Sequence, residues 1–262
     1  MIKCEEITVK FEDYNSSFTA LDRVSLEIHE GEFLCIVGHS GCGKTTLLRV
    51  LAGLQKVTSG TASIDGKEIT GPGTDRTVVF QQYSLFPWMT AKKNILFGLE
   101  QAYPGEDRKK LAAVAQEYLE KVDMADAASK YPYQLSGGMR QRIAIARALA
   151  IDADILLLDE PFGALDARSR ASLQQLLLDL WDGGEKKKTV IFVTHDIDEA
   201  ILLGDRVLFM SPGRIESEVA VNFARPRIKE TLMHEEGYCC IRRGLVDQFY
   251  EDKGGCCSEI HN

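Results

Sequence analysis

The sequence predicts an α/β fold built on a parallel sheet, and three observations support this prediction. Apolar runs at residues 33–37, 155–158 and 189–193 are typical of parallel strands that are buried on both faces. A helical pattern at residues 168–181 lies between the second and third runs. A glycine-rich loop at residues 38–46 follows the first run and leads into another helical pattern, which is the strand–loop–helix context of a phosphate-binding loop.

The loop GHSGCGKTT carries the residue types that hold a polyphosphate. Gly38, Gly41 and Gly43 let backbone N–H groups turn toward an anion, and the positive end of the following helix points at the same place. We expect Lys44 to reach the β- and γ-phosphates and Thr45 to give its hydroxyl to Mg²⁺. This context favours nucleotide binding over a chance glycine-rich turn. The other loop residues expected to bind the nucleotide are Ser40, Cys42 and Thr46.

Cys42 stands next to the start of a predicted helix, where a thiol is expected to have a lowered pKa. We therefore expect alkylation of Cys42 to block nucleotide binding, and bound ATP to protect the thiol.

Two carboxylates follow the apolar run of ILLLDE. The carboxyl ends of parallel strands are where open α/β sheets bind ligands. Asp159 is suited to hold Mg²⁺ through water, and Glu160 to polarise an attacking water. A polar turn after an ordinary strand would look the same in isolation. The phosphate-binding loop upstream favours the catalytic interpretation.

A second anion-binding helix end is indicated by LSGGM. Ser136 is placed to begin a helix, and Gly137 and Gly138 leave open backbone amides there. In isolation, a serine N-cap beside a flexible glycine pair would be the simpler interpretation.

The motifs GHSGCGKTT, VVFQQ, LSGGMRQR, ILLLDEPFGALD and TH occur in this order, and together they resemble the nucleotide-binding subunits of ABC transporters over about residues 2–223. The resemblance implies a P-loop NTPase core of the RecA-like type, with an N-terminal antiparallel β subdomain and an inserted α-helical subdomain. The expected boundaries are an ABC ATPase domain at 1–225, a helical subdomain at about 84–150 and a helical tail at 226–262.

The resemblance also implies an enzyme that hydrolyses ATP with Mg²⁺ between two copies of the subunit. The phosphate-binding loop of one copy faces Ser136, Gly137 and Gly138 of the other, and Asp166 lies in the loop that crosses to the partner.

Further residue roles follow from the same resemblance. Gln81 matches the glutamine that senses Mg²⁺ and the attacking water; Gln82 is adjacent, but Gln81 directly follows the apolar strand end. His195 matches the histidine that contacts the γ-phosphate and positions the catalytic glutamate. Adenine is expected to stack on Phe11, with Tyr14 as the alternative, and some use of GTP is compatible with stacking.

Two segments, residues 71–99 and 224–227, resemble importers of the nitrate, sulfonate and taurine class. Related importers usually carry an additional C-terminal β domain, which we expect this chain to lack. The implied partners are a transmembrane permease and, indirectly, a solute-binding protein, with the chain peripheral on the cytoplasmic face of the membrane. The apolar cluster at residues 83–89 is either a docking surface for the permease or part of the helical subdomain.

Composition restricts the alternatives. With 31 basic and 39 acidic residues the net charge is −8, which argues against a nucleic-acid surface. No signal peptide or membrane-spanning apolar stretch is seen. The cysteine pairs of the tail do not match the spacing of a zinc site. A soluble ABC ATPase uncoupled from transport remains the alternative, and a nucleotide kinase would not need Glu160, LSGG or His195.

Overall fold

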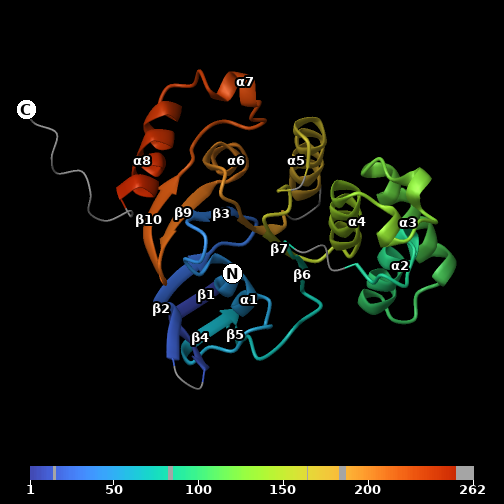
Figure 1. The fold of residues 1–262 in the computed structure, drawn as a ribbon, viewed down its shortest axis with the longest axis horizontal. Coiled ribbons are helices and arrows are strands. Elements are labelled where there is room, and N and C mark those ends of the chain that lie inside the picture. The colour runs from blue at the N-terminus through green and yellow to red at the C-terminus, as the bar shows by residue number, and fades with distance from the viewer. Residues whose placement is uncertain (14–15, 82–84, 164, 183–186, 252–262) are drawn as a thin grey trace, which may run out of the picture.

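The computed structural model describes residues 1–13, 16–81, 85–163, 165–182 and 187–251 of the 262-residue chain. Its described strands form two sheets (Figure 1), one of six strands in the order β10-β9-β3-β8-β7-β6 and one of four in the order β2-β1-β4-β5. Strands β9, β3, β8, β7 and β6 run parallel, and β10 is antiparallel to β9. The strands of the larger sheet are β3 (Phe33–Gly38), β6 (Arg76–Val79), β7 (Ile155–Asp159), β8 (Thr189–Val193), β9 (Arg206–Ser211) and β10 (Arg214–Ala220).

Alternation along the central strands divides the core in two. Successive side chains of a strand point to opposite faces, so Phe33 and Cys35 of β3 face one apolar cluster while Leu34 and Ile36 face the other. The central strands β3, β7 and β8 are buried along their whole length, as the uninterrupted apolar runs predict. Helix α1 (Lys44–Leu51) packs on one face, and α5 (Ala167–Asp182) and α6 (Ile197–Leu203) pack on the other.

The helical part of the fold lies to one side of the sheets (Figure 1). It contains α2 (Ala91–Ala102), α3 (Arg108–Lys121) and α4 (Gly137–Ala150), and these three helices pack on one another. Each begins at a side-chain cap that accepts a backbone N–H, which satisfies donors that have no partner within the helix. The capping residues are Thr90, Asp107 and Ser136.

The first two strands of the smaller sheet form a long hairpin. Apolar and polar residues alternate at 2–11 and again at 21–28, which predicts two strands joined by a long turn. The structure instead continues β1 (Ile2–Asp13) and β2 (Ser16–Ile28) toward each other, with Phe11 opposite Phe18. Aromatic cross-strand pairs stabilise a ladder, which explains why the strands extend so far. Asp65-Gly66, a strong hairpin-turn signal, joins β4 (Ser59–Ile64) to β5 (Lys67–Glu68).

The apolar run at residues 207–210 predicts a final strand. That prediction is wrong about the order, because β10 follows this strand and pairs with it. Strand β10 forms the sheet edge and alternates half-buried with exposed residues, which leaves only a weak apolar signal. The tail then forms α7 (Lys229–Leu232) and α8 (Tyr238–Glu251), close to the predicted helices. In Figure 1, α8 lies beside β10 and away from α2, α3 and α4.

Candidate nucleotide-binding site

The loop between β3 and α1 is shaped by its glycines. Gly43 has φ +112°, and a Cβ there would lie 2.5 Å from the carbonyl oxygen of Ala20, so only glycine fits. Gly41 has φ +82° and faces open space. No side chain caps α1 at Gly43, and its first turn contains no acidic residue. The loop therefore presents backbone N–H groups and the positive end of α1 to an anion.

Lys44 lies within this loop rather than in solvent. It is 6% exposed, and its Nζ donates to the carbonyl oxygens of Gly38 and His39, each at 2.8 Å. The ammonium is thus held at the centre of the loop, where a polyphosphate could meet it.

The expected lowering of the Cys42 pKa is wrong. Cys42 is 1% exposed, and burial raises the pKa of its thiol despite the nearby Lys44 ammonium. Burial disfavours the thiolate more than the single positive charge favours it.

The end of β7 is joined to the start of α1. Thr45 Oγ1 donates to Oδ1 of Asp159 over 3.2 Å, although the two residues are 114 positions apart. Asp159 is 3% exposed, and burial raises the pKa of its carboxyl. A hydroxyl and a carboxylate therefore meet at the phosphate-binding loop, as the sequence predicts.

Glu160 is met by both other residues predicted to act in catalysis. Gln81 Nε2 donates to its Oε2 over 3.1 Å, and His195 Nδ1 lies 3.4 Å from the same oxygen. The backbone of Glu160 has φ +47°, a conformation that non-glycine residues rarely adopt and that is common at functional sites. Three separate strand ends thus deliver Gln81, Glu160 and His195 to one place.

A small cavity of about 40 Å³ is lined by Glu160, His195 and Glu199. Its volume is sufficient for a water molecule, because about 10–15 Å³ of such volume is needed. Glu199 is buried and accepts hydrogen bonds from Thr194 Oγ1 at 2.6 Å and Gln174 Nε2 at 2.7 Å. Burial raises the pKa of Glu199, and the two bonds hold the wall of the cavity in place.

The residues of the predicted second anion site lie at the start of α4. Ser136 Oγ accepts the backbone N–H of Met139 over 3.3 Å at the start of α4. Helix α4 packs against α2, α3 and β6, and in Figure 1 it lies to the side of the sheets, apart from α1. One copy of the chain therefore holds the two predicted anion sites apart.

Asp166 is held by hydrogen bonds from a residue of its own chain. It begins α5, where its carboxylate accepts the backbone N–H of Ser169 at 2.9 Å and the Ser169 hydroxyl at 2.5 Å. The hydroxyl bond is the main cause that lowers the pKa of Asp166. The turn that contains Asp166 is thereby held at the surface.

Phe11 is exposed on the hairpin, with 42% of its surface accessible. The strand beside it passes over the phosphate-binding loop, because the carbonyl of Ala20 lies against Gly43. The alternatives Tyr14 and Gln82 lie outside the described residues.

Sequence reasoning missed two residues beside the site. Gln141 of α4 donates to the carbonyl oxygens of Pro161 and, over 3.4 Å, Glu160, so it connects the LSGGMRQR helix to the turn that follows β7. Its place in that motif was the available signal. His39 packs against Phe249 of α8, a contact between segments that are remote in sequence and that no local pattern could indicate.

Residues 21–163 match the ABC transporter family. The chain is 49% identical to an uncharacterized ABC transporter ATP-binding protein of Methanocaldococcus jannaschii, over 88% of this chain and 86% of that protein. It is 45% identical to the nitrate import ATP-binding protein NrtD of Synechococcus elongatus, over 89% and 85%, and 41% identical to the bicarbonate transport ATP-binding protein CmpD of Synechocystis, over 94% and 88%.

Among solved structures, the chain is similar to a dimeric ATP-binding cassette in a post-hydrolysis state with ADP and phosphate. The TM-score is 0.80 at 35% identity, covering 86% of this chain and all of that one. The sequence match, the fold and the arrangement of the site agree. The chain belongs to the ABC transporter family and is one of its ATP-binding ATPases.

Proposed function

We propose that this chain powers an importer for a small anion by hydrolysing ATP at an interface between two copies. The observation that carries the proposal is the meeting of Gln81 and His195 at one carboxylate oxygen of Glu160, beside the phosphate-binding loop. That arrangement suits the activation of a water next to a bound γ-phosphate.

Each residue has a distinct task in this scheme. Lys44 and the backbone amides of residues 38–46 bind the phosphates, and Phe11 stacks on adenine. Glu160 accepts a proton from the attacking water. His195 orients Glu160 and contacts the γ-phosphate, while Gln81 senses the water. Ser40, Cys42 and Thr46 line the loop that surrounds the triphosphate.

The residues also fit Mg²⁺. Thr45 Oγ1 and Asp159 Oδ1 lie 3.2 Å apart and are oxygen donors, one of them anionic, as this hard cation prefers. The amide oxygen of Gln81 is a further donor. A cation held by these residues would supply positive charge beside the phosphates of a bound nucleotide. These three side chains hold the cation in our proposal.

A second copy completes each site. Ser136, Gly137 and Gly138 lie at the start of α4, apart from α1 of their own chain (Figure 1), so we assign them to the triphosphate bound by a partner. The relative with a solved structure is a dimeric cassette, which supports this arrangement. In the dimer that we propose, Asp166 lies in the loop that crosses from one copy to the other.

The substitution Glu160→Gln tests the proposal. It keeps the shape of the side chain but removes the base, so we expect phosphate release to fall by at least about a hundredfold while ATP binding persists. Gel filtration with Mg²⁺ and ATP should then show a dimer that the apo protein does not form. A Glu160→Gln monomer with full turnover would refute the proposal.

The permease is proposed to dock on an apolar groove of about 460 Å³ lined by Phe86, Phe97 and Arg147. Phe86 packs edge-to-face on Phe97 at 4.9 Å, and Trp88 beside it is 69% exposed. The cluster at residues 83–89 is thus partly packed and partly open, with Tyr83 outside the described residues. An exposed tryptophan beside an apolar groove is typical of an interaction surface.

We expect Trp88→Ala to weaken co-purification with the permease without changing the ATPase rate of the isolated chain. Ile228→Ala, which removes another exposed apolar side chain, is the control and should leave co-purification intact. Equal loss in both variants would contradict this docking surface.

The solute in our proposal is a small anion of the nitrate, sulfonate or taurine class. The nitrate and bicarbonate relatives support a small oxyanion. No helix among the described residues is long and apolar enough to cross a bilayer. By analogy with the import proteins among the relatives, we propose that the permease holds the chain at the cytoplasmic face of the membrane and also meets the solute-binding protein. Transport assays with nitrate, bicarbonate and taurine in the assembled system would identify the solute.

A further inference from the structure

The C-terminal helix α8 contacts the phosphate-binding loop directly. The ring of Phe249 packs edge-to-face against the imidazole of His39, with 4.9 Å between ring centroids. It also packs edge-to-face against Phe209 of β9 at 5.0 Å. His39 and Phe209 are themselves 6.5 Å apart and nearly perpendicular. The three rings therefore form one cluster that joins the loop, the sheet and the tail.

The His39 side chain is held by these ring contacts. Its Nε2 atom is shielded from solvent and has no hydrogen-bond partner among the described residues. Its backbone carbonyl, in contrast, accepts the Lys44 ammonium at 2.8 Å. The residue whose ring packs on Phe249 therefore also supplies one of the carbonyl oxygens that hold Lys44.

Two polar connections keep α8 in place. Tyr238 Oη and Arg242 Nε each donate to Oδ1 of Asp198 at 2.7 Å, and Asp198 lies in α6, three residues after His195. At the other end, Ser217 Oγ of β10 donates to Gln248 Oε1 at 2.7 Å. Leu245 is buried between them, with 1% of its surface exposed. Helix α8 is thus docked along its length.

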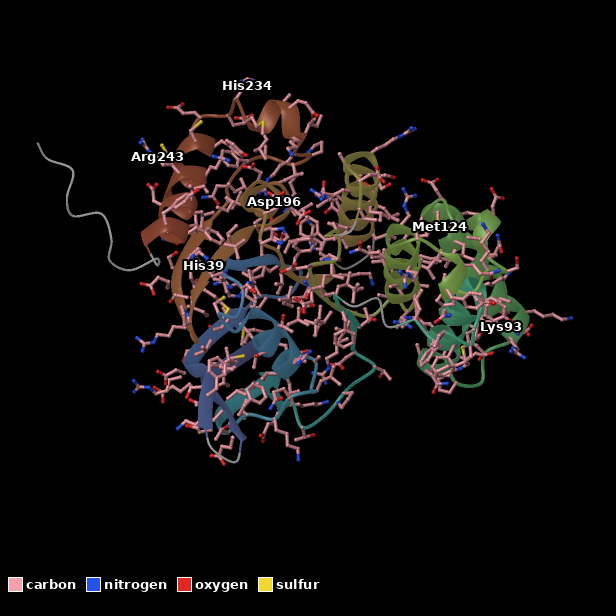
Figure 2. All side chains as sticks on the ribbon, in the orientation of Figure 1. His39, Lys93, Met124, Asp196, His234 and Arg243 are labelled. Carbon is pink, nitrogen blue, oxygen red and sulfur yellow. The ribbon has the colours of Figure 1, made fainter. Side chains whose placement is uncertain are left out.

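The helix also borders the catalytic side of the site. A cavity of about 450 Å³ is lined by His39 and His195 together with Arg242, Phe249 and Tyr250 of α8. Figure 2 shows His39 near the lower end of α8 and Asp196 near α6. One face of α8 therefore meets both the phosphate-binding loop and the loop that carries His195.

We propose that Phe249 is a positioning residue that holds the phosphate-binding loop through His39, so that docking of α8 sets the affinity for ATP. The inference rests on the proposed binding of ATP by residues 38–46. By thermodynamic linkage, a bound nucleotide must then stabilise the docked α8 by the same factor.

The test uses the full chain and a non-hydrolysable ATP analogue with Mg²⁺. We expect Phe249→Ala to raise the dissociation constant about threefold to tenfold, the range that an aromatic edge-to-face pair spans. The KM for ATP should rise by the same factor, while kcat at saturating ATP stays the same. Phe249→Tyr, which keeps the ring, should restore the affinity.

Leu232→Ala is the matched control. It also truncates a buried apolar side chain of the tail, in α7, but lies outside the ring cluster. It should lower the Tm without changing the dissociation constant. Unchanged affinity in Phe249→Ala, or an equal loss in Leu232→Ala, would overturn the inference.

Hydrogen–deuterium exchange of the wild-type chain gives an answer even if Phe249→Ala does not fold. Amides of residues 238–250 should exchange more slowly when the analogue binds, and unchanged exchange would count against the inference. Lys44→Ala separates the two proposals. If the wild-type chain binds the analogue no better than Lys44→Ala, the proposed function itself fails, whereas loss of the α8 effect alone leaves it intact.

Discussion

The side chain of Gln81 donates a hydrogen bond to Glu160 over 3.1 Å, and thereby joins the end of β6 to the end of β7. These strands are neighbours in the sheet, so their carboxyl ends lie at one edge although 79 positions separate the two residues. A substitution of either residue therefore removes a hydrogen bond from the other.

His195→Ala should slow turnover without abolishing ATP binding. His195 lies 3.4 Å from Glu160 and is exposed toward the site, so its loss releases the carboxylate but leaves the phosphate-binding loop unchanged. We expect kcat to fall by about two orders of magnitude. Phosphate release and analogue binding measure the two effects. His29→Ala, an exposed histidine on another surface, should behave like the wild type; a comparable loss there would contradict the assignment.

Asp159→Asn should stabilise the chain while abolishing Mg²⁺-dependent hydrolysis. Burial raises the pKa of Asp159 in the folded state. Between the ordinary pKa and the raised one, the folded state binds more protons, so the free energy of unfolding falls as pH rises and stays lower above that window. Asparagine removes this penalty and can still accept the Thr45 hydroxyl.

Thermal denaturation of Asp159→Asn at pH 7 and at pH 4 tests this. The gain in Tm should be present at pH 7 and smaller at pH 4. Asp154→Asn, at an exposed position just before the same strand, is the control and should show no gain. A lower Tm for Asp159→Asn at pH 7 would show that the carboxylate stabilises the fold.

Maleimide should leave Cys42 unmodified in the native chain. Its thiol is buried and has a raised pKa, whereas Cys239 and Cys240 of α8 are exposed. Because the thiolate is the reactive form, mass spectrometry at pH 7 should find the label on the α8 cysteines first. ATP binding should survive brief treatment. Rapid labelling of Cys42 that ATP prevents would instead restore the expectation from the sequence.

Arg227→Ala should destabilise the fold. The buried guanidinium donates to the backbone carbonyls of Ile201, Gly204, Val221 and Phe223, and burial lowers the pKa of Arg227 to about 10, so it stays charged at neutral pH.

Removing the guanidinium leaves these carbonyls without a donor, which should cost about 3 kcal/mol. Urea denaturation measures the change. Arg243→Ala, an exposed position labelled in Figure 2, should change the stability by less than about 0.5 kcal/mol. A loss below 1 kcal/mol for Arg227→Ala would contradict a structural role, since it would fall under the usual cost (about 1–3 kcal/mol) of an unsatisfied buried group.

Much of the fold could be predicted because its signals are local. The apolar run of β3, the glycines after it and the amphipathic α3 each reflect interactions within a few residues. The sequence did not predict β10 or the outer part of the hairpin. An edge strand buries only every second residue, so its apolar pattern is weak. Its pairing partner, rather than its own composition, decides whether it forms.

The residue pattern alone is enough to predict the glycine-rich loop and to place Asp159 and Glu160 at a strand end, because a strand delivers the residues at its end wherever it lies. The role of His195 came from the family resemblance. The meeting of Gln81 and His195 at Glu160, the burial of the Cys42 thiol and the packing of Phe249 on His39 are visible only in the folded chain. These features arise where segments remote in sequence exclude water between them, and burial there depends on the packed neighbours rather than on the local residue pattern.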